Sequence, residues 1–138
     1  MTTTQHTDVI PPRSYILDAS AIIAYLSGEP GNLLVESHML HSAMSSVNWT
    51  EVIQYVISKN RDVTEVRNSL EQMGLVVASF AQEDAELAAE LRTVTTSAGL
   101  SLADRACLAL ALKLNLPTLT ADRQWTQVDV GVEVQLIR

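Results

Sequence analysis

The sequence predicts an α/β protein with a central, mainly parallel sheet of four to five short strands flanked by helices. Two observations predict this class. Short apolar segments, each the length of one strand, alternate along the chain with longer segments whose apolar residues recur every three or four positions. The segment of residues 101–114 is apolar almost all the way round, as expected for a helix buried inside a protein. Short strands that alternate with helices build a parallel sheet with helices packed against it.

Five segments have the length and apolar character of strands. The first ends at Asp18. The second is weak by propensity, and the last alternates apolar and polar residues, which is typical of an edge strand. In chain order, the predicted strands are residues 15–17, 42–45, 75–77, 118–120 and 132–137.

Six segments between these strands predict helices. The segment that opens at Asn48 shows the clearest pattern, because its apolar residues recur at helical spacing and at no strand spacing. Gly28 stops the first helix, Gly74 stops the fourth, and Pro117 prevents the last helix from continuing. In chain order, the predicted helices are residues 19–26, 32–39, 48–57, 62–73, 82–96 and 101–114.

Composition limits the kind of protein. With 138 residues, of which 47% are apolar, the chain is long enough for one domain with a sizeable core. Its longest apolar runs are far shorter than the roughly 20 residues of a membrane helix, and its start lacks the features of a secretion signal. We therefore expect a flexible N-terminal extension over residues 1–14, a single domain over 15–138 and no membrane association. The only cysteine, Cys107, allows no internal disulfide, which fits the cytoplasm.

Charge restricts how the protein could hold a nucleic acid. Nine basic residues against sixteen acidic ones give a net charge of −7, which argues against binding through a broad positive surface. Aromatic residues make up only 4% of the chain, so a base-stacking platform is also not expected. If the substrate carries phosphate, something other than side chains must supply positive charge.

Four acidic residues occupy positions where ligands of α/β proteins bind. Asp18 and Asp122 each follow a predicted strand, and Glu51 and Asp104 fall in the first turns of predicted helices. In an open α/β sheet, ligands bind outside the carboxyl ends of the strands. We therefore expect these four carboxylates to converge at that edge of the sheet.

Each of the four acids also has an ordinary structural interpretation. Asp18 is placed to cap a helix, and Asp122 is a common type of turn residue. Asn48 with Glu51, and likewise Ser101 with Asp104, match the capping-box pattern or its near variant. For any single acid, the structural interpretation is at least as good as the functional one.

Carboxylates that converge repel one another, and the usual resolution is a bound divalent cation. Ligands that offer only oxygen favour Mg²⁺ or Mn²⁺ over zinc. One or two such ions can activate a water molecule and stabilise the leaving oxygen of a phosphodiester. Ser20 and Thr120 are candidates to position the phosphate or the water, although each is as well explained as a local capping hydroxyl.

Four segments around the acidic residues occur in a characteristic order. They are LDASAIIAYL around Asp18, SSVNWTEV around Glu51, LSLADRACLALA around Asp104 and LTADRQW around Asp122. In these segments the chain resembles the PIN-domain ribonucleases, specifically the VapC-type toxins of toxin–antitoxin pairs. The resemblance covers essentially the chain from Tyr15 onward. The extension before Tyr15 is a departure, because such toxins tend to begin close to their first strand.

The resemblance implies a PIN-like fold and an endoribonuclease activity that depends on Mg²⁺ or Mn²⁺. It also implies a cognate antitoxin that inhibits the protein, and a homodimer. By the same resemblance, Asp18 and Asp104 match the principal metal ligands of the family. Glu51 and Asp122 match the remaining acids of its catalytic site.

Two other functions compete with this hypothesis. The first is a catalytically idle, PIN-like module that only binds partners and keeps its acids for structural reasons. The second is an acid-cluster phosphotransfer domain. The sequence argues against the second, because Asp-Ala-Ser follows Leu17 where aspartate-based phosphatases have Asp-x-Asp, and no lysine lies near Asp122.

Overall fold

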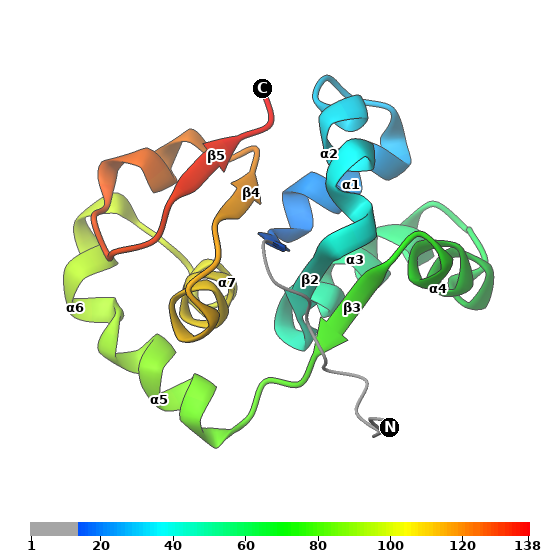
Figure 1. Ribbon diagram of the computed structural model, residues 1–138. Coiled ribbons are helices and arrows are strands. Elements are labelled where there is room, and N and C mark those ends of the chain that lie inside the picture. Colours follow the sequence, from blue (N-terminus) through cyan, green and yellow to red (C-terminus); the bar gives the residue numbers. More distant parts are fainter. Residues whose placement is uncertain (1–13) are drawn as a thin grey trace, which may run out of the picture.

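Five short strands, all parallel, form one sheet in the order β3-β2-β1-β4-β5 (Figure 1). The computed structural model describes residues 14–138. β1 is the central strand, because it pairs with β2 on one side and with β4 on the other. β5 pairs with β4 alone and is an edge strand, as predicted. The strands are β1 (Tyr15–Leu17), β2 (Ser42–Ser45), β3 (Leu75–Ala78), β4 (Thr118–Thr120) and β5 (Val134–Leu136).

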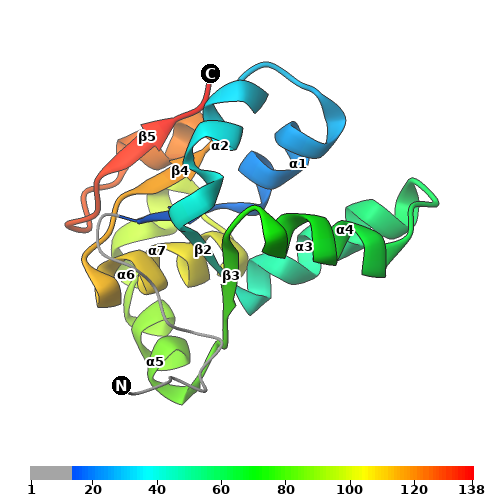
Figure 2. The same cartoon turned by 45° about the vertical axis from the view of Figure 1, so that its right-hand side comes forward.

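Seven α-helices in the described part of the chain cover the two faces of this sheet. The first four pack on one face and the last three on the other (Figures 1 and 2). The α-helices are α1 (Ala19–Ser27), α2 (Asn32–His38), α3 (Ser46–Ser58), α4 (Val63–Gln72), α5 (Gln82–Glu90), α6 (Arg92–Thr95) and α7 (Leu102–Leu114). Three short 3₁₀ helices are η1 (Met39–His41), η2 (Thr96–Ala98) and η3 (Arg123–Gln127).

The strands divide the core into two layers because successive side chains of a strand point to opposite faces. In β1, Leu17 packs with the layer under α1–α4, and Ile16 packs with the layer under α5–α7. Residues 106–111 of α7 are all buried, which confirms the prediction of an internal helix. The sheet therefore has both faces covered, and its ligands must enter at an edge.

The helix predicted to open at Asn48 begins earlier, at Ser46. Ser45, the last residue of β2, caps it by accepting a hydrogen bond from the Val47 amide (3.2 Å). Asn48 is therefore inside α3 rather than at its cap, and Glu51 lies in its second turn. The capping box proposed for Asn48 and Glu51 is wrong. The helix begins earlier because serine caps a helix at least as well as asparagine and Ser45 precedes Asn48 in the chain.

The single helix predicted over residues 82–96 is broken into α5, α6 and η2. Three of the last four residues are threonine or serine, which bond back to the preceding turn and bend helices. Thr95 donates to the Leu91 carbonyl (2.8 Å), and Thr96 donates to the Arg92 carbonyl (2.5 Å). Gly99, with φ of 71°, then ends this segment in the left-handed conformation.

The predicted N-terminal extension, residues 1–14, lies outside the described residues except for Ser14, which is buried. Among the helices that the structure describes, none is both long and apolar enough to span a membrane.

Candidate functional site

One cavity of about 270 Å³ is lined by all four acids that the sequence singled out. Its lining consists of Asp18, Ala19, Ser20, Ile23, Glu51, Asp104 and Asp122. The cavity lies at the carboxyl edge of the sheet, because Asp18 follows β1 and Asp122 comes two residues after β4. Glu51 reaches it from α3, which follows β2, and Asp104 from the first turn of α7. No lysine or arginine is among the described residues that line it.

Asp18 is the most deeply buried of these acids, with 5% of its surface exposed. Its Oδ2 atom accepts hydrogen bonds from the hydroxyls of Ser20 (2.7 Å) and Thr120 (2.9 Å). The pKa of Asp18 is raised from 3.8 to about 6, mainly because the carboxylate is buried. The two hydrogen bonds lower this pKa, and the negative charges of Asp104 and Glu51 raise it further. The Asp18 backbone occupies the N-cap of α1, but its side chain caps no backbone amide of that helix and accepts the Ser20 hydroxyl instead. Its interpretation as a helix cap is therefore wrong.

Ser20 and Thr120 hold Asp18 rather than capping a helix. The Ser20 hydroxyl also accepts from the Ala121 amide (3.0 Å), and the Thr120 hydroxyl accepts from the Asp122 amide (3.0 Å). Each hydroxyl thus joins the carboxylate beyond β1 to the backbone that leaves β4. The two side chains fix the position of Asp18 relative to Asp122.

Asp104 lines the cavity and at the same time caps its own helix. Its Oδ2 atom accepts from the Ser101 amide (2.9 Å), and its own amide donates to the Ser101 hydroxyl (3.1 Å), so the capping box predicted for this pair is confirmed. Asp122 likewise accepts from the Gln124 amide (2.9 Å) and caps η3. A structural role and a place in the cavity are therefore compatible in both residues.

Glu51 is less buried than Asp18 and is coupled to Asp104. Burial is the main cause that raises the pKa of Glu51, a hydrogen bond from Asn48 lowers it, and the charge of Asp104 raises it. The charges of both residues also raise the pKa of Asp18. Three of the four carboxylates are therefore close enough to repel one another.

The donor set fits a hard divalent cation. It offers only oxygen ligands, and the lining residues within the described part of the chain include no side-chain cation to neutralise them. As positioned, no three acidic, histidine or cysteine side chains within residues 14–138 form a ready-made metal group. In Asp104 and in Asp122, one carboxylate oxygen accepts a hydrogen bond from a backbone amide. Each of these carboxylates has a second oxygen to offer.

Asn48 is a site residue that the sequence interpretation assigned to the wrong role. It is fully buried, and its Nδ2 atom donates to the Ala103 carbonyl of α7 (3.0 Å). Asn48 therefore connects the helix that carries Glu51 to the helix that carries Asp104. A signal was present in the sequence, because Asn48 stands four and eight positions before the core residues Val52 and Val56 and so belongs to the same buried stripe.

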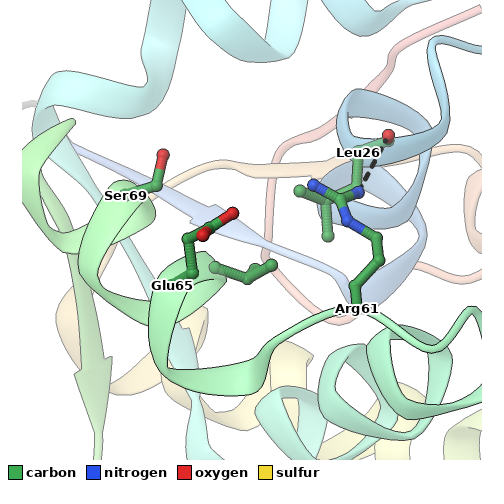
Figure 3. A pocket seen from close by; sticks show the side chains of 5 residues that line it. Leu26, Arg61, Glu65 and Ser69 are labelled. Carbon is green, nitrogen blue, oxygen red and sulfur yellow. Dashed lines mark hydrogen bonds between the residues drawn. The ribbon is translucent and has the colours of Figure 1, made fainter.

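A smaller cavity of about 160 Å³ lies between the end of α1 and α4 (Figure 3). Arg61 and Glu65 both line it, and Arg61 donates to the Leu26 carbonyl (3.4 Å). Opposite charges share this cavity, so it offers neither a metal nor an anion a consistent set of ligands.

Comparison with known proteins adds the family and the fold. The model of the PIN domain family matches residues 15–131. None of the curated protein sequences compared with the chain matches it. Among solved structures, the chain is similar to a toxin–antitoxin complex from Klebsiella pneumoniae, with a TM-score of 0.74 and 22% identity over 91% of this chain and 98% of that one.

Two further structures show the same likeness. A DNA-bound VapBC from Salmonella typhimurium has a TM-score of 0.71 and 15% identity, over 91% of this chain and 98% of that one. FitAcB from Neisseria gonorrhoeae has a TM-score of 0.68 and 18% identity, over 87% of this chain and 95% of that one. At these identities, the structures establish a common fold.

Proposed function

The chain belongs to the PIN domain family, and from that premise we propose that it is a metal-dependent endoribonuclease, the toxin of a type II toxin–antitoxin pair. In this proposal it hydrolyses RNA phosphodiester bonds, and a cognate antitoxin inhibits it. The observation that carries the proposal is the single cavity lined by Asp18, Glu51, Asp104 and Asp122 without a cationic side chain among its described lining residues.

These four carboxylates would hold one or two Mg²⁺ or Mn²⁺ ions. Such ions supply a nucleophile from water at neutral pH and stabilise the charge that develops on the leaving oxygen. They also supply the positive charge that a chain with a net charge of −7 lacks for a phosphate substrate.

The residues of the chain prepare this site in three ways. Ser20 and Thr120 fix the buried Asp18 carboxylate by two hydrogen bonds, so that it does not turn away from the cavity. Asn48 holds α3 against α7 and thereby sets Glu51 relative to Asp104. Because burial raises the pKa of Asp18 to about 6, this ligand is ionised mainly above that pH, and a bound cation extends its ionised range to lower pH.

The structural neighbours support the partner in this proposal. The similar structures from Klebsiella pneumoniae and Salmonella typhimurium are a toxin–antitoxin complex and a VapBC bound to DNA. We extend this to a cognate antitoxin for the present chain, to a homodimer and to action in the cytoplasm.

Cleavage of a structured RNA in Mg²⁺ or Mn²⁺ tests the proposed activity. We expect cutting by the wild-type protein, and a loss of at least about 100-fold in Asp104→Asn or in chelator, since even the loss of a group that only orients a metal ligand costs about 10–100-fold. Asp129→Asn is the matched control, because Asp129 is exposed and does not line the cavity. Full activity of Asp104→Asn, or full activity in chelator, contradicts the proposal.

A binding module without catalysis is the second candidate. The observation in its favour is that the described acids do not stand as a ready-made metal group. It requires that the purified protein cut no RNA in a random pool with either metal, while antitoxin binding survives Asp104→Asn.

A further inference from the structure

A third cavity has the opposite charge to the cavity lined by Asp18, Glu51, Asp104 and Asp122, which we call the carboxylate cavity. It has a volume of about 280 Å³ and is bounded by α6, η2 and the first turn of α7. Figure 1 shows α6 and α7 close together. Arg92 and Arg105 both line it, and its described lining includes no acidic residue. We call it the arginine cavity. Its lining is Arg92, Thr95, Thr96, Gly99, Leu100, Ser101, Leu102 and Arg105.

No carboxylate among the described residues neutralises the charge of either guanidinium group. Ion pairs within residues 14–138 engage Lys113 and Arg138 but neither of these arginines. Arg105 donates from Nη1 to the Ala88 carbonyl (2.8 Å), while its Nε atom is buried and has no hydrogen-bond partner among the described residues. Arg92, which also lines the cavity, is exposed. An uncompensated buried donor next to a second cation favours an anionic ligand.

Ser101 adds a neutral donor to this cavity. Its hydroxyl oxygen accepts the Asp104 amide (3.1 Å), which leaves the O–H hydrogen free for a second bond. The hydroxyls of Thr95 and Thr96, in contrast, already donate to the Leu91 and Arg92 carbonyls. The lining side chains that still have unused donors are therefore those of the two arginines and Ser101.

The arginine cavity and the carboxylate cavity approach each other at the N-terminal cap of α7. Ser101 lines the first and Asp104 lines the second, and the two residues bond to each other twice in the cap of α7. Lining residues of the two cavities are therefore in direct contact, and one extended ligand could reach both. A nucleic acid strand combines a phosphodiester that metal ions can hydrolyse with neighbouring phosphates that arginines bind, and in the proposed function this strand is RNA.

We propose that the arginine cavity binds a backbone phosphate of the RNA, next to the phosphodiester that is cut at the carboxylate cavity. The planar guanidinium group matches two phosphate oxygens at once, and phosphate contacts position a nucleic acid without reading its sequence. This subsite rests on the proposed RNA substrate. It explains how an acidic chain holds RNA, since two arginines on one cavity replace a broad positive surface.

The direct test is RNA binding in EDTA, where cleavage does not interfere. The probe is a fluorescein-labelled, mixed-sequence RNA of about 12 nucleotides, followed by fluorescence anisotropy over a range of salt concentrations. We expect Arg92→Gln and Arg105→Gln each to weaken binding about tenfold and to reduce the salt slope by about 0.7, the value for one phosphate contact in a single strand. Arg67→Gln on α4 removes the same charge away from both cavities and serves as the matched control.

Cleavage kinetics give a second readout. Arg92→Gln is expected to raise KM and leave kcat near the wild-type value, because it removes binding that ground state and transition state share. Arg92 is exposed, so this variant keeps the fold even if Arg105→Gln, which loses the bond to Ala88, does not.

Each outcome separates the subsite from the nuclease. Binding by Arg92→Gln as tight as that by Arg67→Gln overturns the subsite and leaves the nuclease standing if the wild type still cuts RNA. Weakened binding with no cleavage by the wild type supports the subsite and overturns the nuclease.

Leu102, exposed by 56%, lies on the same cavity. If light scattering shows that Arg92→Gln changes the oligomeric state together with RNA binding, the cavity is a contact between subunits and the proposal fails.

Discussion

The hydroxyl of Thr120, at the end of β4, donates a hydrogen bond of 2.9 Å to the carboxylate of Asp18, just beyond β1. The two residues are far apart in sequence but lie at the ends of strands that pair directly. The same hydroxyl accepts the Asp122 amide, so it fixes two acids of the carboxylate cavity together. Four expectations follow from this arrangement and from the contacts around it.

Thr120→Val removes a hydrogen bond that favours the charged form of Asp18. We expect the pKa of Asp18 to rise further, because the bond lowers it in the wild type. The acid limb of the cleavage rate should therefore move to higher pH in a pH–rate profile with Mg²⁺. Thr118→Val is the control, since Thr118 is buried in the same strand and donates instead to the Glu133 carbonyl. An unshifted acid limb in Thr120→Val contradicts this role.

Asp18 should make the metal-free protein less stable as the pH rises. Its pKa is raised on folding from 3.8 to about 6, so between these values the folded state binds more protons than the unfolded state. We expect the free energy of unfolding in chelator to fall by up to about 3 kcal/mol as the pH rises through this window. Asp18→Asn should remove the fall and be the more stable protein at pH 7, measured by urea unfolding. A wild type that gains stability over this window, relative to Asp18→Asn, is the contrary result.

Metal ions should stabilise the fold through the same carboxylates. A ligand that binds only the folded state stabilises it by about 2.7 kcal/mol at a concentration 100 times its Kd. We therefore expect Tm to rise with added Mg²⁺ or Mn²⁺ for the wild type and for Asp129→Asn. The rise should be lost in Asp18→Asn and Asp104→Asn. Equal increases of Tm in all four proteins would place the metal elsewhere.

Asn48→Ala should weaken both the fold and the site. The substitution leaves the Ala103 carbonyl without its donor, and a lost buried hydrogen bond costs about 1–3 kcal/mol. It also removes the bond that lowers the pKa of Glu51. We expect lower stability in urea unfolding, together with a pH–rate profile displaced to higher pH. Thr50→Ala, on an exposed position of the same helix, should change neither.

Local pattern was enough to predict most of the architecture. The strands at residues 15–17, 42–45 and 118–120 have the predicted bounds, and α7 is buried as its all-round apolar composition indicated. The place of Asp18 and Asp122 at strand ends also followed from sequence, because a strand and the residue after it are set by neighbouring residues alone. The same holds for the capping box of Ser101 and Asp104, whose members are three residues apart.

The tertiary structure alone decided how the acids are held. The sequence offered Asn48 as a cap and Ser20 and Thr120 as local hydroxyls, whereas the fold buries Asn48 against Ala103 and directs both hydroxyls to Asp18. It also brought Arg92 and Arg105 to one cavity. The physical reason is that caps and strands depend on neighbours in the chain. Burial, pKa and the partner of a hydrogen bond depend on residues that only the packing of α3, α7 and the sheet brings together.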